Sequence, residues 1–342
     1  MKTVRLHPLS AWLVLGLGFT LPFSGCRTIP PPGTLAPRRG DEIVVAGQFI
    51  HTGTPVVTWL DPGGYDAYRV ERRFSPLEHA DWDSSRQEVE DLTSPNRYGL
   101  RRERLLPSQL EQIRGGGWDL ATLTNVIDQF VIHYDACGTS RQCFKVLHDH
   151  RDLSVHFLLD LDGTIYQTLD LKERAWHATT SNTRSIGIEI AHPGAYRRDR
   201  SRPLDEWYRR DRTGRLRIEI PERFGDGGLR TAGFVGRPAR NNLISGVVQG
   251  AELVQYDYTR EQYAALIRLT AALCRVFPAL RCDWPRDHSG APIARKLADD
   301  ELRAYQGLLG HLHIQANKVD SGPAFQWDYV IRRSRGLLRQ NP

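Results

Sequence analysis

The sequence predicts an α/β fold in which helices flank a central mixed β-sheet. Apolar runs of strand length occur at 129–133 and 155–159, and residues 185–190 alternate between isoleucine and small or polar residues. A long helical pattern follows Thr259. Strand and helix signals mix along the chain without an internal repeat, which is typical of a sheet with helices on its faces.

The strand signals also indicate which side chains face a cleft. Asp162-Gly163 predicts a hairpin turn between strands at 155–159 and 164–168. Within 185–190 the isoleucines share one face, so Glu189 lies on the other face. A glutamate on the cleft face of a central strand is a candidate general base.

Three helices are expected beside these strands. Thr259-Arg260-Glu261-Gln262 has the form of a capping box, and the apolar residues after it recur at helical spacing until Pro278. Further helices are expected within 141–150 and 299–309.

The domain organisation follows from these signals. Residues 41–119 read as an N-terminal extension, and residues 120–335 as one domain. The stretch 193–258 is a long irregular insertion directly after the strand of Glu189, so we expect it to border the cleft. Its aromatic residues either contact a glycan or form a small satellite core, and the second interpretation is favoured.

The N-terminus carries a targeting signal. Residues 1–25 combine a basic start with a short apolar run, which is typical of an export signal and too short for a membrane-spanning helix. Small residues before Cys26 resemble the lipobox of bacterial lipoproteins, which implies a lipid-anchored periplasmic protein of the cell envelope. The alternative is plain secretion with Cys26 as a leftover thiol. The proline-rich segment 26–40 is suited to an extended tether.

The charge pattern excludes one class of partner. The formal net charge is +6. The sequence has no basic cluster interleaved with aromatic residues, the pattern that would indicate nucleic-acid binding. A mild basic excess is compatible with an anionic envelope polymer.

Four cysteines follow Cys26 in two local pairs. Cys137 and Cys143 are six residues apart, and Cys274 and Cys282 are eight apart. In an exported protein such pairs are oxidised by the compartment, so two local disulfides are expected. The alternative is a structural zinc site, although the spacing lacks the tight Cys-x2-Cys form.

Two distant stretches together offer the ligands of an open zinc site. His133 ends an apolar strand, whereas Gly310-His311 and Asp320 lie near the C-terminus. Catalytic zinc takes three nitrogen, oxygen or sulfur ligands and leaves one position to water. Lys318 stands two residues before the carboxylate, where its charge would stabilise an oxyanion. The pattern predicts a zinc-dependent amide hydrolase.

These pieces occur in the order found in the type 2 N-acetylmuramoyl-L-alanine amidases, a family related to phage amidases and peptidoglycan recognition proteins, which the chain resembles. The segments that carry the resemblance are Val131-Ile132-His133, Ser154-Val155-His156, Asp162-Gly163, Ala175-Trp176-His177-Ala178, Ile186 to Glu189, Gly310-His311 and Lys318 to Phe325. Ser321 departs from the pattern by replacing a proline, and the insertion 193–258 is unusual. The cysteines 137 and 143 resemble a disulfide of the recognition proteins.

The resemblance implies specific roles. Zn²⁺ would be bound by His133, His311 and Asp320. Glu189 would be the general base, and Lys318 the cation that stabilises the oxyanion.

Four further residues would contact the substrate or orient the ligands through hydrogen bonds. They are His177, His156, His313 and Trp176.

The implied activity is cleavage of the amide between N-acetylmuramic acid and L-alanine in peptidoglycan or muropeptides. Two alternatives stay open. One is a peptidoglycan-binding module without hydrolysis, and the other is a zinc amidase that acts on a different N-acyl substrate.

Overall fold

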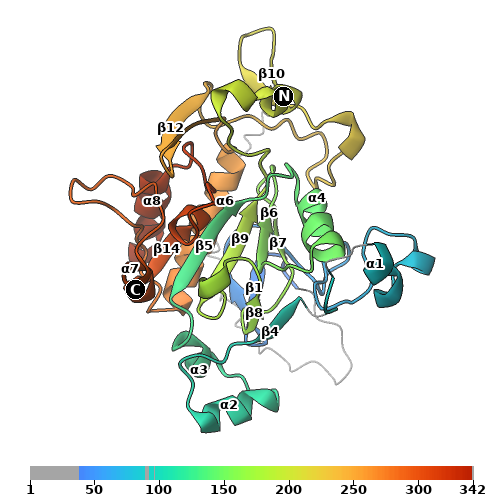
Figure 1. The fold of residues 1–342 in the computed structure, drawn as a ribbon, viewed down its shortest axis with the longest axis vertical. Helices are drawn as coiled ribbons and strands as arrows, with labels where there is room; N and C mark the ends of the chain where they lie inside the picture. The colour runs from blue at the N-terminus through green and yellow to red at the C-terminus, as the bar shows by residue number, and fades with distance from the viewer. Residues whose placement is uncertain (1–37, 89–91, 96, 341–342) are drawn as a thin grey trace, which may run out of the picture. The chain divides into compact units, whose positions relative to one another are not determined.

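A computed structural model describes residues 38–88, 92–95 and 97–340 (Figure 1). The chain divides after Arg38, and the helices and strands given below belong to the unit Arg39–Pro342. Its central sheet has six strands in the order β14-β5-β9-β6-β7-β3, all parallel to their neighbours except the β6–β7 pair. The strands are β3 (Val56–Thr58), β5 (Gln129–Tyr134), β6 (Phe157–Leu159), β7 (Ile165–Gln167), β9 (Ser185–Ile190) and β14 (Gly307–Gly310). The predicted mixed sheet is confirmed.

Smaller two-stranded antiparallel sheets surround the central one. They pair β1 (Glu42–Val45) with β2 (Gln48–His51), β4 (Tyr98–Leu100) with β8 (Glu173–Ala175), β10 (Tyr208–Arg210) with β11 (Leu216–Ile218), and β12 (Ile244–Val248) with β13 (Ala251–Gln255). The β4–β8 pair brings the N-terminal extension beside the segment that leads to His177.

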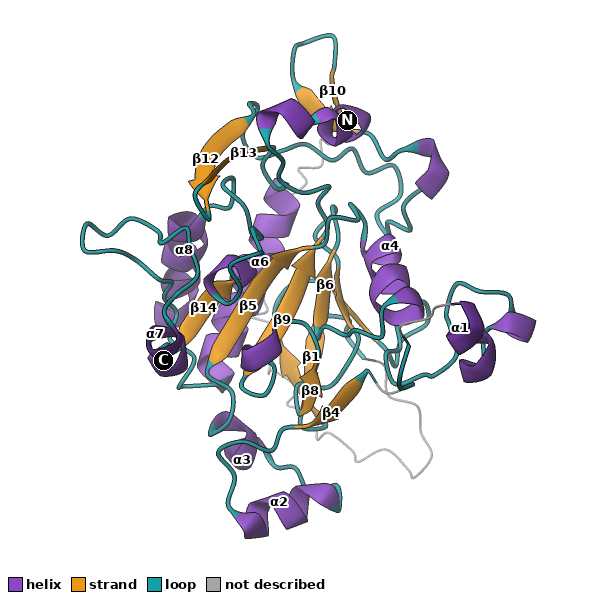
Figure 2. Ribbon diagram, viewed as in Figure 1, coloured by secondary structure: helices purple, strands orange, loops and turns teal. Residues whose placement is uncertain are grey.

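Helices flank the sheet, as the sequence predicts (Figure 2). They are α1 (Trp82–Glu88), α2 (Pro107–Arg114), α3 (Leu120–Thr124), α4 (Ser140–Phe144) with a π-helix over Lys145–His150, α5 (Arg202–Trp207), α6 (Arg260–Val276), α7 (Asp299–Ala304) and α8 (Trp327–Arg339). Short 3-10 turns span Leu77–His79, Thr179–Ser181, Arg198–Arg200, Glu222–Phe224 and His311–His313. The capping box at the start of α6 is formed, since Thr259 Oγ1 accepts from Gln262 N and Gln262 Oε1 accepts from Thr259 N.

Strand alternation separates the main core from the cleft face. Ile186, Ile188 and Ile190 are buried in the same cluster as the apolar faces of α6 and α8. Because successive side chains of a strand point to opposite faces, Glu189 and its β5 neighbour His133 lie on the side away from α6 and α8.

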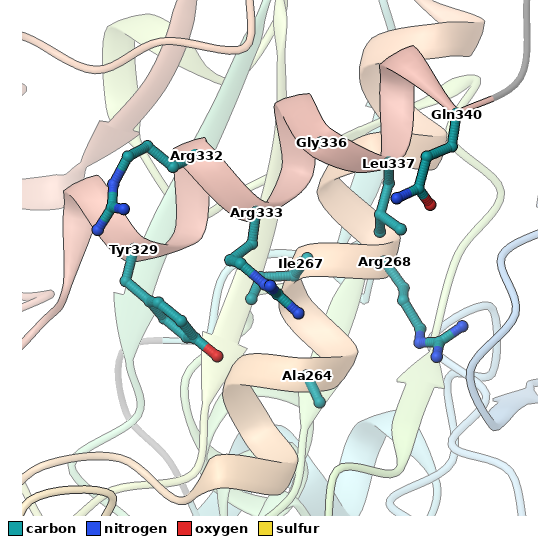
Figure 3. Close-up of a pocket in the computed structure, with 9 residues that line it drawn as sticks. All are labelled: Ala264, Ile267, Arg268, Tyr329, Arg332, Arg333, Gly336, Leu337 and Gln340. Carbon is teal, nitrogen blue, oxygen red and sulfur yellow. The ribbon is translucent and has the colours of Figure 1, made fainter.

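A separate groove lies between α6 and α8 (Figure 3). Ile267 and Leu337 line it together with Arg268, Arg332 and Arg333. None of the predicted site residues lines this groove, so its arginines provide controls away from the cleft.

The C-terminal part of the sheet differs from the expectation for 299–309. Helix α7 ends at Ala304, and residues 307–310 form strand β14 instead. Gly307, the first residue of β14, has a φ of +145°, a conformation that favours glycine. The fully buried Leu308 and Leu309 fill a parallel strand, and so short an apolar run does not distinguish strand from helix.

The segments outside the predicted domain also contribute to the fold. Strand β3, which lies in the N-terminal extension, pairs with β7 and completes the edge of the central sheet. Within the insertion, Trp207 and Tyr208 pack with Leu204, Leu216 and Val254. The favoured satellite core is therefore present.

The two expected disulfides are not formed. Cys137, Cys143, Cys274 and Cys282 are all free thiols. The thiols of each expected pair nevertheless lie within hydrogen-bonding reach of each other.

The expected signal peptide, Cys26 and most of the tether lie outside the described residues. Over the described part of the chain, no helix is both long enough and apolar enough to span a membrane.

Candidate active site

Two parallel strands bring the predicted histidines together. His133 is the fifth residue of β5, and His311 directly follows β14. The register aligns Gly310 with Ile132, and each of these two residues is followed directly by a histidine. Binding sites of open α/β sheets lie at the carboxyl ends of such strands, which is where this pair is located.

Asp320 returns to the same point from the loop after His311. The amide of Leu312 donates to the carbonyl of Asp320 at 2.9 Å, which closes the loop. Asp320 Oδ2 lies 3.0 Å from His133 Nδ1 and 3.2 Å from His311 Nδ1. The two Nδ1 atoms are 3.0 Å apart. All three residues are buried, so three potential ligand atoms converge away from bulk water.

Hydrogen bonds behind the histidines orient their lone pairs toward this point. His311 Nε2 lies 2.6 Å from Gln315 Oε1, an acceptor, so Nε2 carries the proton and Nδ1 is free. His133 Nε2 lies 3.0 Å from His177 Nδ1, whose ring continues to Ser185 Oγ at 3.2 Å. A proton on Nε2 of His133 satisfies this chain and leaves its Nδ1 free as well.

The charge states suit metal binding. Burial and, to a smaller extent, the neighbouring His311 lower the pKa of His133 to about 4. Burial opposes ionisation of Asp320, but the adjacent imidazoles of His133 and His311 hold its pKa below the ordinary value. Neutral imidazoles and an ionised carboxylate are the forms that bind metal ions.

The geometry fits a tetrahedral ion. With ligand bonds of about 2.0–2.1 Å, the ligand atoms of a tetrahedral zinc site are roughly 3.3 Å apart. The three distances here are 3.0, 3.0 and 3.2 Å. Three acceptor atoms without a proton between them repel one another unless a cation binds among them. His133, His311 and Asp320 could therefore hold Zn²⁺ with one position left open.

Glu189 lies beside this point. Its Oε1 is 3.9 Å from His133 Nδ1, and its Oε2 is buried without a hydrogen-bond partner among the described residues. Burial raises the pKa of Glu189 well above its ordinary value, and the charge of Asp320 adds to this shift. An unpartnered carboxylate oxygen can accept a proton from a reactant in the cavity.

The Ile-Gly-Ile-Glu strand has a local reason for its glycine. A Cβ on Gly187 would lie 2.5 Å from the ring of His177. Any other residue there would displace that ring, which contacts His133. Gly187 thus makes room for the histidine that orients a ligand.

One cavity of about 300 Å³ encloses these groups. Its lining includes Glu189, Lys318, Trp176 and His177 besides the three candidate ligands. Lys318 therefore lines the same cavity as the three candidate ligands. We call this space the metal cavity.

Two predicted residues do not line the metal cavity. His156 is fully buried, accepts from Gly187 N at 3.1 Å and contacts the carbonyl of Glu173. His313 accepts from Gly310 N at 2.8 Å and contacts the carbonyl of Ile293. Both hold the backbone near the site: His156 supports β9, and His313 supports the turn that carries His311.

The insertion acts differently from the expectation. No residue of 193–258 lines the metal cavity. Instead, Gln249 Nε2 donates to the carbonyls of Leu312, Gln315 and Lys318 at 2.7, 3.1 and 3.1 Å. The insertion therefore stabilises the loop between His311 and Asp320 through hydrogen bonds, without lining the metal cavity.

Sequence reasoning missed two supporting glutamines. Gln315 stands four residues after His311, a spacing that could have indicated its contact with the ring. Gln249 lies in a hairpin turn far away in sequence, where no local signal predicts its partners.

Comparison with known proteins agrees with this geometry. The N-acetylmuramoyl-L-alanine amidase family model matches residues 123–323, which is more than half of the chain. No curated protein sequence matches.

Three solved structures are similar in part. A selenomethionine derivative of AmpD has 19% identity and a TM-score of 0.32, and the match covers 72% of this chain and 92% of that one. The amidase AmiD from E. coli, in complex with the substrate anhydro-N-acetylmuramic acid-L-Ala-D-γ-Glu-L-Lys, has 17% identity, a TM-score of 0.33 and coverage of 60% and 57%. The endolysin amidase LysCS from Clostridium intestinale has 14% identity, a TM-score of 0.31 and coverage of 62% and 86%.

The structural similarities are too low to add to the family match. The assignment rests on the match over 123–323, which contains His133, Glu189, His311 and Asp320. The chain belongs to the type 2 N-acetylmuramoyl-L-alanine amidase family and is a peptidoglycan amidase.

Proposed function

We propose that this amidase depends on zinc and cleaves the bond between the lactyl group of N-acetylmuramic acid and L-alanine. The observation that carries the proposal is the convergence of three potential ligand atoms, from His133, His311 and Asp320, beside Glu189. When bound there, Zn²⁺ would lower the pKa of a water ligand toward roughly 7 and polarise the scissile carbonyl.

Side chains of the protein transfer the proton and stabilise the developing negative charge. Water oxygen bonds to the lactyl carbonyl carbon, and the bond from that carbon to the nitrogen of L-alanine breaks. Glu189 takes the proton from the attacking water and passes it to the departing amine. Lys318 stabilises the negative charge on the carbonyl oxygen, and removing such a group typically costs on the order of 10²–10³ in turnover.

The complete site favours hydrolysis over recognition alone. Binding without chemistry needs neither three converging ligands nor Glu189 with a free, buried carboxylate oxygen. Two histidines and a carboxylate also hold ferrous iron in oxygenases. Metal analysis of the purified protein distinguishes the two ions.

We also infer that the protein works in the cell envelope, attached through lipidated Cys26. The export signal and the lipobox-like residues before Cys26 support this inference. In an oxidising compartment the adjacent thiols of Cys137 and Cys143, and of Cys274 and Cys282, would form disulfides. Intact-mass and peptide analysis of protein from the envelope would show the lipid and the loss of two hydrogens per pair.

The decisive test of function uses muropeptides and simple N-acyl amino acids side by side. The zinc-loaded chain should release peptides with a free L-alanine amino group from muropeptides only. A chelator should abolish the release, and added zinc should restore it. Absence of release by a fully zinc-loaded protein would contradict the proposal, and preferential cleavage of the simple substrates would favour a different N-acyl substrate.

A further inference from the structure

A second cavity adjoins the metal cavity. It has a volume of about 500 Å³ and shares Trp176 with the metal cavity. Trp176 directly precedes His177, the residue that contacts His133. Trp176 therefore borders both cavities.

The N-terminal extension builds one wall of the second cavity. Strand β4 pairs with β8, which places Gly99 opposite Arg174. Tyr98, Gly99 and Arg102 line the cavity from the extension, and Arg174 lines it from the family domain. The adjacent Arg101 anchors this wall, because its buried guanidinium donates to the carbonyls of Leu171, Thr183 and Ser185, among others.

The second cavity is cationic. Among the described residues, neither Arg102 nor Arg174 has an ion pair or a side-chain hydrogen bond. One carboxylate, that of Glu103, also lines the cavity and accepts from Thr183 Oγ1 at 3.0 Å. Among the described residues that line the cavity, two guanidinium groups against one carboxylate leave an excess of positive charge that suits an anionic ligand.

Gly99 provides an independent observation. It occupies the middle of β4, where glycine costs conformational entropy. A Cβ at Gly99 would meet no atom of the described residues within 4 Å, and its φ does not require glycine. No contact with the described part of the chain therefore explains the missing side chain. Glycine in a strand often marks the close approach of a ligand.

We propose that the second cavity binds a carboxylate of the peptide stem, with Arg174 as its principal partner and Gly99 making room for the peptide. This proposal rests on the proposed function, because the stem is the part of the substrate that continues from L-alanine. Arg174 is three residues from His177, a span of at most about 10 Å. The carboxylate would therefore belong to one of the first residues after L-alanine, and an uncharged glycan would gain little from the guanidinium groups.

The test measures binding, which is independent of turnover. Calorimetry would compare the free tripeptide L-Ala-D-γ-Glu-L-Lys with the same peptide carrying amidated carboxylates. The parent should bind the free carboxylate form about ten- to a hundredfold more tightly, the usual effect of a charged hydrogen bond. Arg174→Gln should abolish this preference, and Gly99→Ala should weaken binding of the free form severalfold. Arg333→Gln, from the groove between α6 and α8, should change neither.

The outcomes separate the two proposals. Equal binding of both peptides by the parent, or an unchanged preference in both Arg174→Gln and Gly99→Ala, would overturn the subsite. Binding that depends on Arg174 in a protein that cleaves no muropeptide would support the subsite and contradict the proposed function. Thermal unfolding of each variant would show that it is folded.

Discussion

The metal cavity and the second cavity share Trp176 but draw on different parts of the chain. The residues that line the metal cavity lie within 123–323, the range of the family match. The second cavity takes Tyr98, Gly99 and Arg102 from residues before that match. The difference indicates that the metal cavity draws only on the part common to the family, whereas the second cavity combines Arg174 of that part with residues that precede it.

The largest effect is expected from a ligand change. Asp320→Ala removes one of three ligand atoms and leaves two neutral imidazoles, so the protein should lose its zinc. Turnover should fall by about 10³-fold or more for free and amidated stems alike, since the metal supplies several kcal/mol of transition-state stabilisation. Metal content and turnover would be measured together with Arg333→Ala as control. An Asp320→Ala protein that keeps one zinc and parental turnover would refute the ligand assignment.

The next effect concerns the base. Glu189→Gln keeps the shape of the side chain but cannot take a proton, so kcat should fall by roughly 10²–10⁴-fold with zinc still bound. Because burial disfavours the charged carboxylate, the variant should be at least as stable as the parent. Turnover, zinc content and thermal unfolding would be compared. Unchanged kcat would remove Glu189 from the mechanism.

A smaller effect is expected from a change in the residue that contacts a ligand histidine. His177→Ala removes the acceptor that orients the ring of His133. Loss of such a hydrogen-bond partner typically lowers metal affinity or activity by about 10- to 100-fold. Competition with a chelator would give the zinc dissociation constant, with the exposed His150→Ala as control. Zinc affinity within twofold of the parent would show that His177 does not position His133.

The smallest effect tests the insertion. Gln249→Ala removes three hydrogen bonds to the loop that carries Lys318. We expect kcat to fall by about three- to tenfold with a lower melting temperature, since each such bond contributes roughly 0.5–1.5 kcal/mol. The loss should be equal for free and amidated stems, and the exposed Gln87→Ala should show neither change. A selective loss for one stem would instead connect the insertion to the second cavity.

Sequence patterns that extend over only a few neighbouring residues, such as strand alternation and a capping box, predicted the corresponding elements correctly. The alternation around Glu189 gave the correct face, and the capping box at Thr259 began α6 as expected. The helix expected over 299–309 is wrong for residues 307–309, because the burial that makes them a strand depends on β5, which is distant in sequence.

The site was predictable where motifs mark it and not where tertiary contacts do. The converging positions of His133, His311 and Asp320 follow from the ordered motifs. The roles of Gln249 and of the wall at Gly99 follow only from long-range pairing. The cysteine spacing indicated proximity, but spacing alone does not decide whether a bond forms.

The most direct test of the account is an anomalous diffraction measurement at the zinc edge on crystals of the purified protein. The account predicts one strong peak within about 2.0–2.2 Å of the Nδ1 atoms of His133 and His311 and of a carboxylate oxygen of Asp320. A zinc-replete crystal with no peak there, or with its peak at Cys137 and Cys143 instead, would contradict it.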